Sequence, residues 1–236
     1  MEKMRINKFL ANKGICSRRE ADKLIEDGKV EVNGKKATTG EKVDEKDYIK
    51  INGKKIGIEE EKKVYILLNK PKKCLCSSKD DRGRKTVVDM VNAKERIYPI
   101  GRLDYDTEGL IILTNDGGLY NKVIHPRSEV YKTYIAKIWG KITKDKLDAL
   151  SRGVRLEDGM TLPAKLKLIK SDDRISQVEI SIREGRNRQV RRMFDAVGHK
   201  VQELQRTSIG EIKVEDLEIG KWRELSKKEI KYLYNL

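Results

Sequence analysis

Residues 99–113 read PIGRLDYDTEGLIIL, and this stretch organises the larger part of the chain. An apolar segment on each side of a short polar stretch predicts two strands, over 98–103 and 110–113, joined by a loop. Gly101 and Gly109 bracket the loop and permit tight turns. Asp104 and Asp106 lie between them. By pattern alone the simplest interpretation is a surface turn with capping aspartates, and the alternative is a reactive carboxylate held between two strands.

The pattern around this stretch predicts an α+β fold. Apolar or alternating segments at 64–68, 131–138 and 177–182 favour further strands, and the apolar spacing over 190–197 favours a helix. Strands interspersed with few helices are typical of a mostly antiparallel, mixed sheet flanked by those helices. No glycine-rich phosphate loop or dinucleotide fingerprint occurs. The larger domain is expected to span 64–236, after a polar linker over 57–63.

Residues 1–60 predict a separate small domain of two helices and hairpins. Ile6, Phe9 and Leu10 have the spacing of an amphipathic helix. Ser17 and Glu20 form a capping box that starts a second helix. Two similar segments, VEVNGKK at 30–36 and IKINGKK at 49–55, then alternate into Asn-Gly, which is the strongest short-range signal for a β-hairpin.

The composition favours a polyanionic partner. The formal net charge is +15, with 39% charged residues, and such a balance most often serves nucleic-acid binding. The alternative is a solvated, lysine-rich surface. Residues 1–60 hold 15 Lys and Arg against 12 Asp and Glu, so most of the excess charge lies in the larger domain. No signal peptide or membrane-length apolar run is apparent, so a cytoplasmic location is expected. Three cysteines and two histidines favour neither a disulfide framework nor a metal site.

The segment MRINKFLANKGICSRREADKLIEDGKVEVNGKKAT, residues 4–38, closely resembles the RNA-binding module named after ribosomal protein S-four. The resemblance implies that the second helix and the loop after it lie against structured RNA. Contacts to phosphate hold and orient an RNA without reading its sequence. The side chains expected to make them are Arg18, Arg19, Lys23, Lys29 and Lys35.

A second basic segment, EGRNRQVRRMF at 184–194, carries four arginines. The helical spacing of the apolar residues from Val190 onward defines a buried face. Arg188 and Arg192 then point away from that face, and Arg191 lies on its flank. An arginine there could hold a partly buried carboxylate, keep it ionised and fix its direction. We therefore expect Arg191 to pair with Asp104. The alternative is an ordinary basic helix touching RNA phosphates, with Arg186, Arg188 and Arg192 as the contacts.

Three segments together, GRLDYDTEGLIILTNDG at 101–117, YKTYIAK at 131–137 and EGRNRQVRRMFDAVGHKVQELQRTSIG at 184–210, closely resemble the RsuA/RluB family of ribosomal RNA pseudouridine synthases. The resemblance implies that Asp104 is the catalytic aspartate. Tyr134 matches the tyrosine that lies against the target base, and Arg191 matches the basic residue paired with the aspartate. Arg102 matches the arginine that fills the gap left by the extruded base in a related branch. Asp106 is expected to cap a turn.

The implied reaction breaks the bond from ribose to the glycosidic nitrogen of uridine and rejoins the base through a ring carbon. It needs no redox partner or group donor, so neither a cofactor nor a metal is expected. Within the family the sequence looks most like the large-subunit branch that acts on 23S rRNA, and the branch acting on 16S rRNA is the alternative. A non-catalytic ribosome-assembly factor is a further alternative. Ribosomal RNA or a subunit precursor is the expected partner, and a monomer the expected state.

Overall fold

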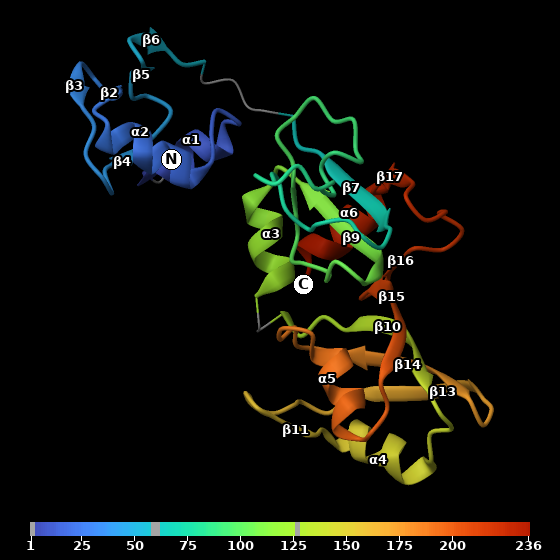
Figure 1. The fold of residues 1–236 in the computed structure, drawn as a ribbon. Helices are drawn as coiled ribbons and strands as arrows, with labels where there is room; N and C mark the ends of the chain where they lie inside the picture. Colours follow the sequence, from blue (N-terminus) through green and yellow to red (C-terminus); the bar gives the residue numbers. More distant parts are fainter. Residues whose placement is uncertain (1–2, 58–61, 126–127) are drawn as a thin grey trace. The chain divides into compact units, whose positions relative to one another are not determined.

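The computed structural model describes residues 3–57, 62–125 and 128–236 and divides the chain into two compact units (Figure 1). The first comprises Met1–Val64 with Ala93–Arg96 and Asn115–Gly117, and the second holds the other residues. The elements of the first unit are β1 (Met4–Arg5), α1 (Ile6–Asn12), α2 (Arg18–Glu26), β2 (Val30–Val32), β3 (Lys35–Lys36), β4 (Lys42–Val43), β5 (Ile49–Ile51) and β6 (Lys54–Lys55).

Local sequence signals account for the first unit. Ser17 accepts a hydrogen bond from the Glu20 amide, and Glu20 accepts one from the Ser17 amide, which completes the predicted capping box of α2. Asn33 and Asn52 have φ of 51°, and each precedes a glycine, so both hairpins have the predicted left-handed turn residues. The strands form one four-stranded sheet in the order β3-β2-β5-β6. The apolar residues of α1 and α2 pack with this sheet in one core.

The second unit is built on a nine-stranded sheet, and the expected α+β class with mostly antiparallel pairing is confirmed. The main path runs β13-β14-β10-β15-β9-β7-β17, and β8 and β16 pair at its sides. The strands are β7 (Tyr65–Lys70), β8 (Tyr98–Pro99), β9 (Glu108–Thr114), β10 (Lys132–Trp139), β13 (Lys165–Ser171), β14 (Ile175–Ile182), β15 (Val201–Ile209), β16 (Ile212–Lys213) and β17 (Trp222–Glu224). A separate hairpin joins β11 (Arg155–Leu156) and β12 (Gly159–Met160).

Four helices complete the described part of the second unit: α3 (Gly117–Ile124), α4 (Lys144–Arg152), α5 (Gln189–Ala196) and α6 (Lys227–Tyr234). Leu119 of α3 and Leu233 of α6 pack with Leu67, Leu110 and Ile112 of the sheet in one buried cluster. α5 contacts β11 and β15. No described helix is long and apolar enough to cross a membrane.

The prediction of a strand over 98–103 is right only for its first two residues. β8 ends at Pro99, and residues 100–107 form a loop, because the Thr107 amide donates to the Asp104 carbonyl at 3.1 Å and closes a turn. The loop leads into β9, which pairs in parallel with β15 through Glu108 and Gly109. A Cβ on Gly109 would lie 2.1 Å from the Arg206 carbonyl oxygen, and its φ is 108°. Only glycine permits this close approach of β9 and β15.

Candidate active site

One cavity in the second unit gathers most of the predicted catalytic residues. Its volume is about 560 Å³, within the range of pockets that enclose small molecules. Asp104 and Arg102 enter it from the loop at 100–107, and Tyr134 enters it from β10. Four chain segments that are distant in the sequence therefore meet here: this loop, the inner face of β10, residues 182–190 and the inner face of β15.

The loop that carries Asp104 is held by buried groups on its inner side. Lys70, which is fully buried, donates from Nζ to the Thr107 carbonyl at 2.8 Å. Burial lowers the pKa of the Lys70 amine. The Leu103 amide donates to the Cys76 Sγ at 3.2 Å, and burial raises the pKa of the Cys76 thiol. These bonds fix the loop at both sides of Asp104, which is the support that a reactive group needs.

The arginine pairing differs from the sequence prediction. Arg191 pairs with Asp106, with Nη2 at 3.2 Å from Oδ2, rather than with Asp104. Its Nη2 also donates to the Asp106 carbonyl at 3.1 Å, so Arg191 fixes both the backbone and the side chain of that residue. The cation beside Asp104 is Arg188, with Nη1 at 3.7 Å from Oδ2. Arg188 also donates to both carboxylate oxygens of Asp106, at 3.2 and 3.3 Å.

The sequence predicts that Arg188 points away from the buried face of the helix, and it does not predict that Arg188 lies beside Asp104. Arg188 is the residue before the first turn of α5, and its backbone is left-handed with φ of 47°. A helical-wheel projection therefore does not apply to it. A non-glycine residue in this conformation is uncommon, and here it directs the guanidinium toward the loop at 100–107 rather than along the helix surface.

Asp106 is an ionised member of the site rather than only a turn cap. Burial would raise the pKa of its carboxyl, but the hydrogen bonds from Arg188 and the charges of Arg191 and Arg188 lower it below its ordinary value. Two carboxylates and two guanidiniums thus form one cluster. Asp104 and Arg188 line the cavity, whereas Asp106 and Arg191 lie outside its lining, and Arg191 is the buried member, at 7% exposed. This arrangement keeps the loop in one position while the Asp104 side chain stays 29% exposed.

Tyr134 is the only one of two nearby tyrosines that lines the cavity, as the sequence predicts. It is buried, and it lies opposite Ile180 on β14 and Arg206 on β15. Tyr131 lies just before β10, and its ring is covered by the Lys165 amine at 4.3 Å from the ring centroid. The Tyr134 ring has no such cationic cover among the described residues, and it presents a stacking surface to whatever enters the cavity.

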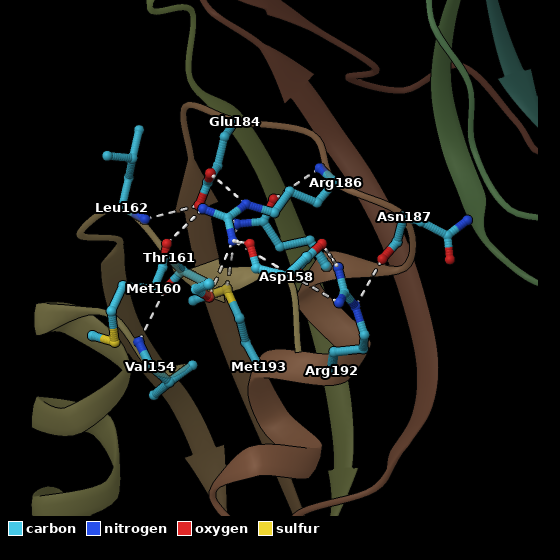
Figure 2. A network of polar contacts seen from close by, with 12 residues as sticks. Val154, Asp158, Met160, Thr161, Leu162, Glu184, Arg186, Asn187, Arg192 and Met193 are labelled. Atoms are coloured by element: carbon cyan, nitrogen blue, oxygen red, sulfur yellow. Dashed lines mark hydrogen bonds and ion pairs between the residues drawn. The ribbon is translucent and has the colours of Figure 1, made fainter. Parts of the chain in front are cut away.

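Arg186 and Arg192 hold the β11–β12 hairpin next to the cavity (Figure 2). Arg186 donates to the carbonyls of Gly159 and Met160, and its Nε pairs with Glu184 at 3.0 Å. Arg192 makes a two-pronged pair with Asp158, at 3.0 and 2.8 Å. Their RNA-contact role stays a prediction, and the structure adds an internal role. Glu184 also accepts from the Leu162 amide at 2.8 Å, which fixes Leu162 on the cavity wall.

The basic residues expected to bind RNA in the first unit are solvent-exposed, and most of them are not paired with a described carboxylate, unlike Arg186 and Arg192. All five are exposed: Arg18, Arg19, Lys23, Lys29 and Lys35. Lys29 pairs with Asp27 at 2.9 Å. Within the described ranges the other four make no ion pair, so their charges are available to a ligand.

Three further cations line the cavity, and the sequence interpretation had left them out: Lys132, Arg183 and Arg206. Arg206 on β15 is 3% exposed, and Lys132 begins β10. Alternation along residues 201–209 could have placed Arg206 on the inner face with Leu204. Neither at the cavity nor anywhere else among the described residues could a group of three or more His, Cys, Asp or Glu side chains hold a metal ion.

A cavity of nucleoside size on a mixed sheet, with a carboxylate, an aromatic wall and several guanidiniums, suits an enzyme that acts on a nucleic-acid base. The same chain carries a basic helix-and-hairpin unit, which favours RNA as the substrate. Comparison with known proteins agrees. Residues 64–196 match the family described as RNA pseudouridylate synthase, and residues 4–49 match the S4 domain.

The similarity to individual proteins extends over nearly the whole chain. A Bacillus subtilis protein named ribosomal large subunit pseudouridine synthase B is 49% identical, covering 97% of this chain and 95% of that protein. The Escherichia coli dual-specificity RNA pseudouridine synthase RluF is 39% identical over 99% of this chain and 79% of its own length. A crystal structure of a pseudouridylate synthase superposes with a TM-score of 0.71 at 33% identity, covering 98% of this chain and 99% of that one. The chain belongs to the RsuA/RluB type of the RNA pseudouridine synthase family, with an N-terminal S4 domain.

Proposed function

We propose that this chain isomerises a specific uridine of ribosomal RNA to pseudouridine, and that the uridine lies in 23S rRNA. The observation that carries the proposal is the cavity in which Asp104 faces the same space as Tyr134. The name of the 49% identical relative supports the large subunit. The 39% identical relative is called dual-specific, so the identity of the target RNA needs its own test.

In this proposal Asp104 is the group that acts on the ribose. The Arg188 guanidinium lies beside it, with Nη1 at 3.7 Å from the Asp104 Oδ2. The carboxylate either adds to the anomeric carbon or removes a ribose proton to give a glycal. Arg191 is a positioning residue, since it holds Asp106 and the Thr107 end of the loop rather than Asp104 itself.

The uridine must leave its stack before it can reach Asp104, at a cost of a few kcal/mol. Tyr134 offers the flipped base a new stacking surface, worth roughly 1–3 kcal/mol. Arg102 is exposed at the edge of the cavity, where its side chain could occupy the space that the base leaves. The cavity walls of Ile182, Leu204 and Ile209 would retain the loose uracil.

The proposal includes the setting of the reaction. The S4 domain holds the RNA through phosphate contacts, from side chains including Arg18, Arg19, Lys23 and Lys35. The isomerisation requires no cofactor. The enzyme acts as a monomer in the cytoplasm, on free rRNA or on a subunit precursor.

The deciding experiment is a pseudouridine map of total rRNA from cells with and without this gene, by carbodiimide-stop sequencing. Loss of one site in 23S rRNA is the expected result. Loss of one site in 16S rRNA would keep the chemistry and contradict the large-subunit assignment. An unchanged map would favour an assembly factor that binds rRNA without modifying it.

The chemical role of Asp104 is tested with the purified enzyme. Asp104→Asn keeps the shape of the side chain and removes its charge, so turnover should fall by at least about 10⁴-fold while RNA affinity changes little. Asp173→Asn is the matched control, because its side chain is 95% exposed and remote from the cavity lining. Substantial turnover by the Asp104 variant would refute the assigned role.

A further inference from the structure

Arg206 is a buried cation whose guanidinium is only partly hydrogen-bonded within the described part of the protein. Its Nε donates to the Leu110 carbonyl at 2.8 Å. Its Nη2 is buried and has no hydrogen-bond partner in the described part of the chain. No described carboxylate lies within ion-pair distance of it. An unpartnered donor of this kind is rare in folded proteins and calls for a specific explanation.

The position of Arg206 links the two predicted catalytic segments. It lies opposite Tyr134 in the pairing of β10 with β15, so the two side chains occupy the same face of the sheet as close neighbours. Its backbone also pairs with Gly109, five residues after Asp104, where no side chain fits between the strands. Arg206 therefore lies beside the stacking surface and is joined directly to the strand that follows the aspartate loop.

A β-bulge sets the register between Arg206 and Tyr134. Thr133 pairs with Ser208 and Tyr134 pairs with Arg206, which leaves Thr207 as an extra residue on β15. Such bulges change which side chains face a site and are common next to active sites. Here the bulge sets Arg206 opposite Tyr134 and Ile209 opposite Lys132.

The surroundings of Arg206 are positive. Burial lowers the pKa of the Lys132 amine, and the nearby Arg206 charge lowers it further. The carboxylates of the cavity have other partners: Glu129 pairs with Arg183 at 3.0 Å, and Asp104 lies near Arg188. Two cations without a described counter-ion, next to an aromatic wall, suit a ligand that brings negative charge to the base side of the cavity.

We propose that Arg206 is a substrate-binding residue that donates a hydrogen bond from Nη2 to a ring carbonyl oxygen of the flipped uracil. This inference rests on the proposed uridine isomerisation. When the C1′–N1 bond breaks, its electron pair passes to the base, and the negative charge spreads over N1 and the two carbonyl oxygens. Arg206 keeps its proton and stabilises that charge in a site of low dielectric.

The remaining steps balance without another reactant than water. The C5 atom of the uracil forms the new carbon–carbon bond to C1′. As it does so, the ester bond between C1′ and the Asp104 carboxylate breaks or, on the glycal route, Asp104 returns the ribose proton to C2′. The proton on C5 is lost to water, and N1 takes a proton from water, so the product is an isomer of the substrate. Arg206 stays bound to the uracil while the base rotates, after the C1′–N1 bond has broken and before the C1′–C5 bond forms. Once N1 is protonated the ring is neutral, and Arg206 releases it.

The test compares Arg206→Gln with wild type in single-turnover reactions on an RNA fragment that carries the uridine found by the map. The rate constant should fall about 10²- to 10³-fold, as when one preorganised donor is removed elsewhere, while the RNA dissociation constant stays nearly unchanged. Arg174→Gln, an exposed arginine, is the matched control and should behave as wild type. An inactive wild type would overturn the proposed function, whereas an active wild type with an equally active Arg206 variant would overturn only this inference.

Sulfur substitution of the substrate separates binding from a structural role. A thiocarbonyl is a weaker hydrogen-bond acceptor, so 2-thiouridine or 4-thiouridine at the target should slow wild type. The same substitution should cost the Arg206→Gln enzyme much less, because the bond is already absent. Equal losses in both enzymes at both positions would overturn the inference. If the Gln variant does not fold, the series is run with wild type and Arg206→Lys, and a wild type indifferent to both sulfurs overturns it equally.

Discussion

The two basic regions of this enzyme contain the same kinds of side chain in opposite circumstances. In the S4 domain, Arg18, Arg19, Lys23 and Lys35 are exposed and make no ion pair within the described residues. In the segment 186–192, every arginine contacts a carboxylate of its own domain. A free surface charge is available to RNA phosphate, whereas a paired arginine mainly fixes protein geometry. The first region is therefore suited to holding RNA and the second to shaping the cavity.

The largest effect that tests this contrast should follow from Arg191→Gln. The change removes a buried guanidinium that holds the Asp106 side chain and backbone, so the loop at 100–107 loses its position. A misplacement of about 1 Å can cost roughly 10²-fold in rate, and we expect kcat to fall by that order while KM and the salt dependence of binding change little. Arg191→Lys keeps the charge and should recover part of the rate. A normal kcat with weakened binding would instead place Arg191 among the RNA contacts.

The opposite pattern is expected when the free charges of the S4 domain are removed. Replacing Arg18, Arg19, Lys23 and Lys35 together by Gln should weaken RNA binding and lower the slope of log K against log salt by about 0.7 for each lost phosphate contact. Turnover at saturating RNA should stay near the wild-type rate. Titrations at several salt concentrations measure both quantities.

Lys29 supplies a graded control for that experiment. Its amine already pairs with Asp27, and the pKa of the Asp27 carboxyl is lowered by that hydrogen bond. Lys29→Gln should therefore change the salt slope less than Lys23→Gln does. An equal change in the salt slope for both variants would mean that the ion pair with Asp27 does not keep Lys29 from binding RNA phosphate.

A smaller effect is expected at the hairpin that Arg186 and Arg192 hold. Asp158→Asn removes the carboxylate that pairs with Arg192 and lies near Arg186, so both guanidiniums gain freedom. If these arginines serve mainly to position the hairpin, RNA affinity should stay constant and kcat/KM should fall several-fold. Tighter binding with a steeper salt dependence would show that the two arginines bind RNA phosphate once Asp158 no longer pairs with them. Asp173→Asn again serves as the control.

The sequence predicts most of the S4 domain and much less of the arginine chemistry. The Asn33 and Asn52 turns and the Ser17 capping box depend on neighbouring residues alone, so local pattern is enough. The α+β class follows in the same way from alternation. The pairing of Arg188 and Arg191 does not, because it depends on a left-handed residue before α5. Alternation along β15 is enough to place Arg206 on the inner face. Its register opposite Tyr134 depends on the extra residue Thr207 in β15, and no local signal marks such a bulge.

The smallest effect compares two capping boxes, one in the S4 domain and one in the larger domain. Ser17 and Glu20 start α2, and Ser226 and Glu229 start α6, but only Glu229 also pairs with an arginine, Arg223, at 2.7 Å. That hydrogen bond lowers the pKa of the Glu229 carboxyl to about 2. At pH 7 we expect Glu229→Gln to lower the free energy of unfolding by roughly 1 kcal/mol, and Glu20→Gln to lower it by less.

The pH dependence of the Glu229 effect has a defined sign. A carboxyl whose pKa is lower in the folded state than in the unfolded state stabilises the fold fully above its ordinary value of 4.5, and this stabilisation is lost as the pH falls toward 2. The difference between wild type and Glu229→Gln should therefore be largest at neutral pH and should shrink steadily between pH 4.5 and pH 2. Urea unfolding at pH 7, 4 and 3 measures it, and a difference that stays constant over this range would mean that Glu229 acts through its cap geometry rather than through its charge.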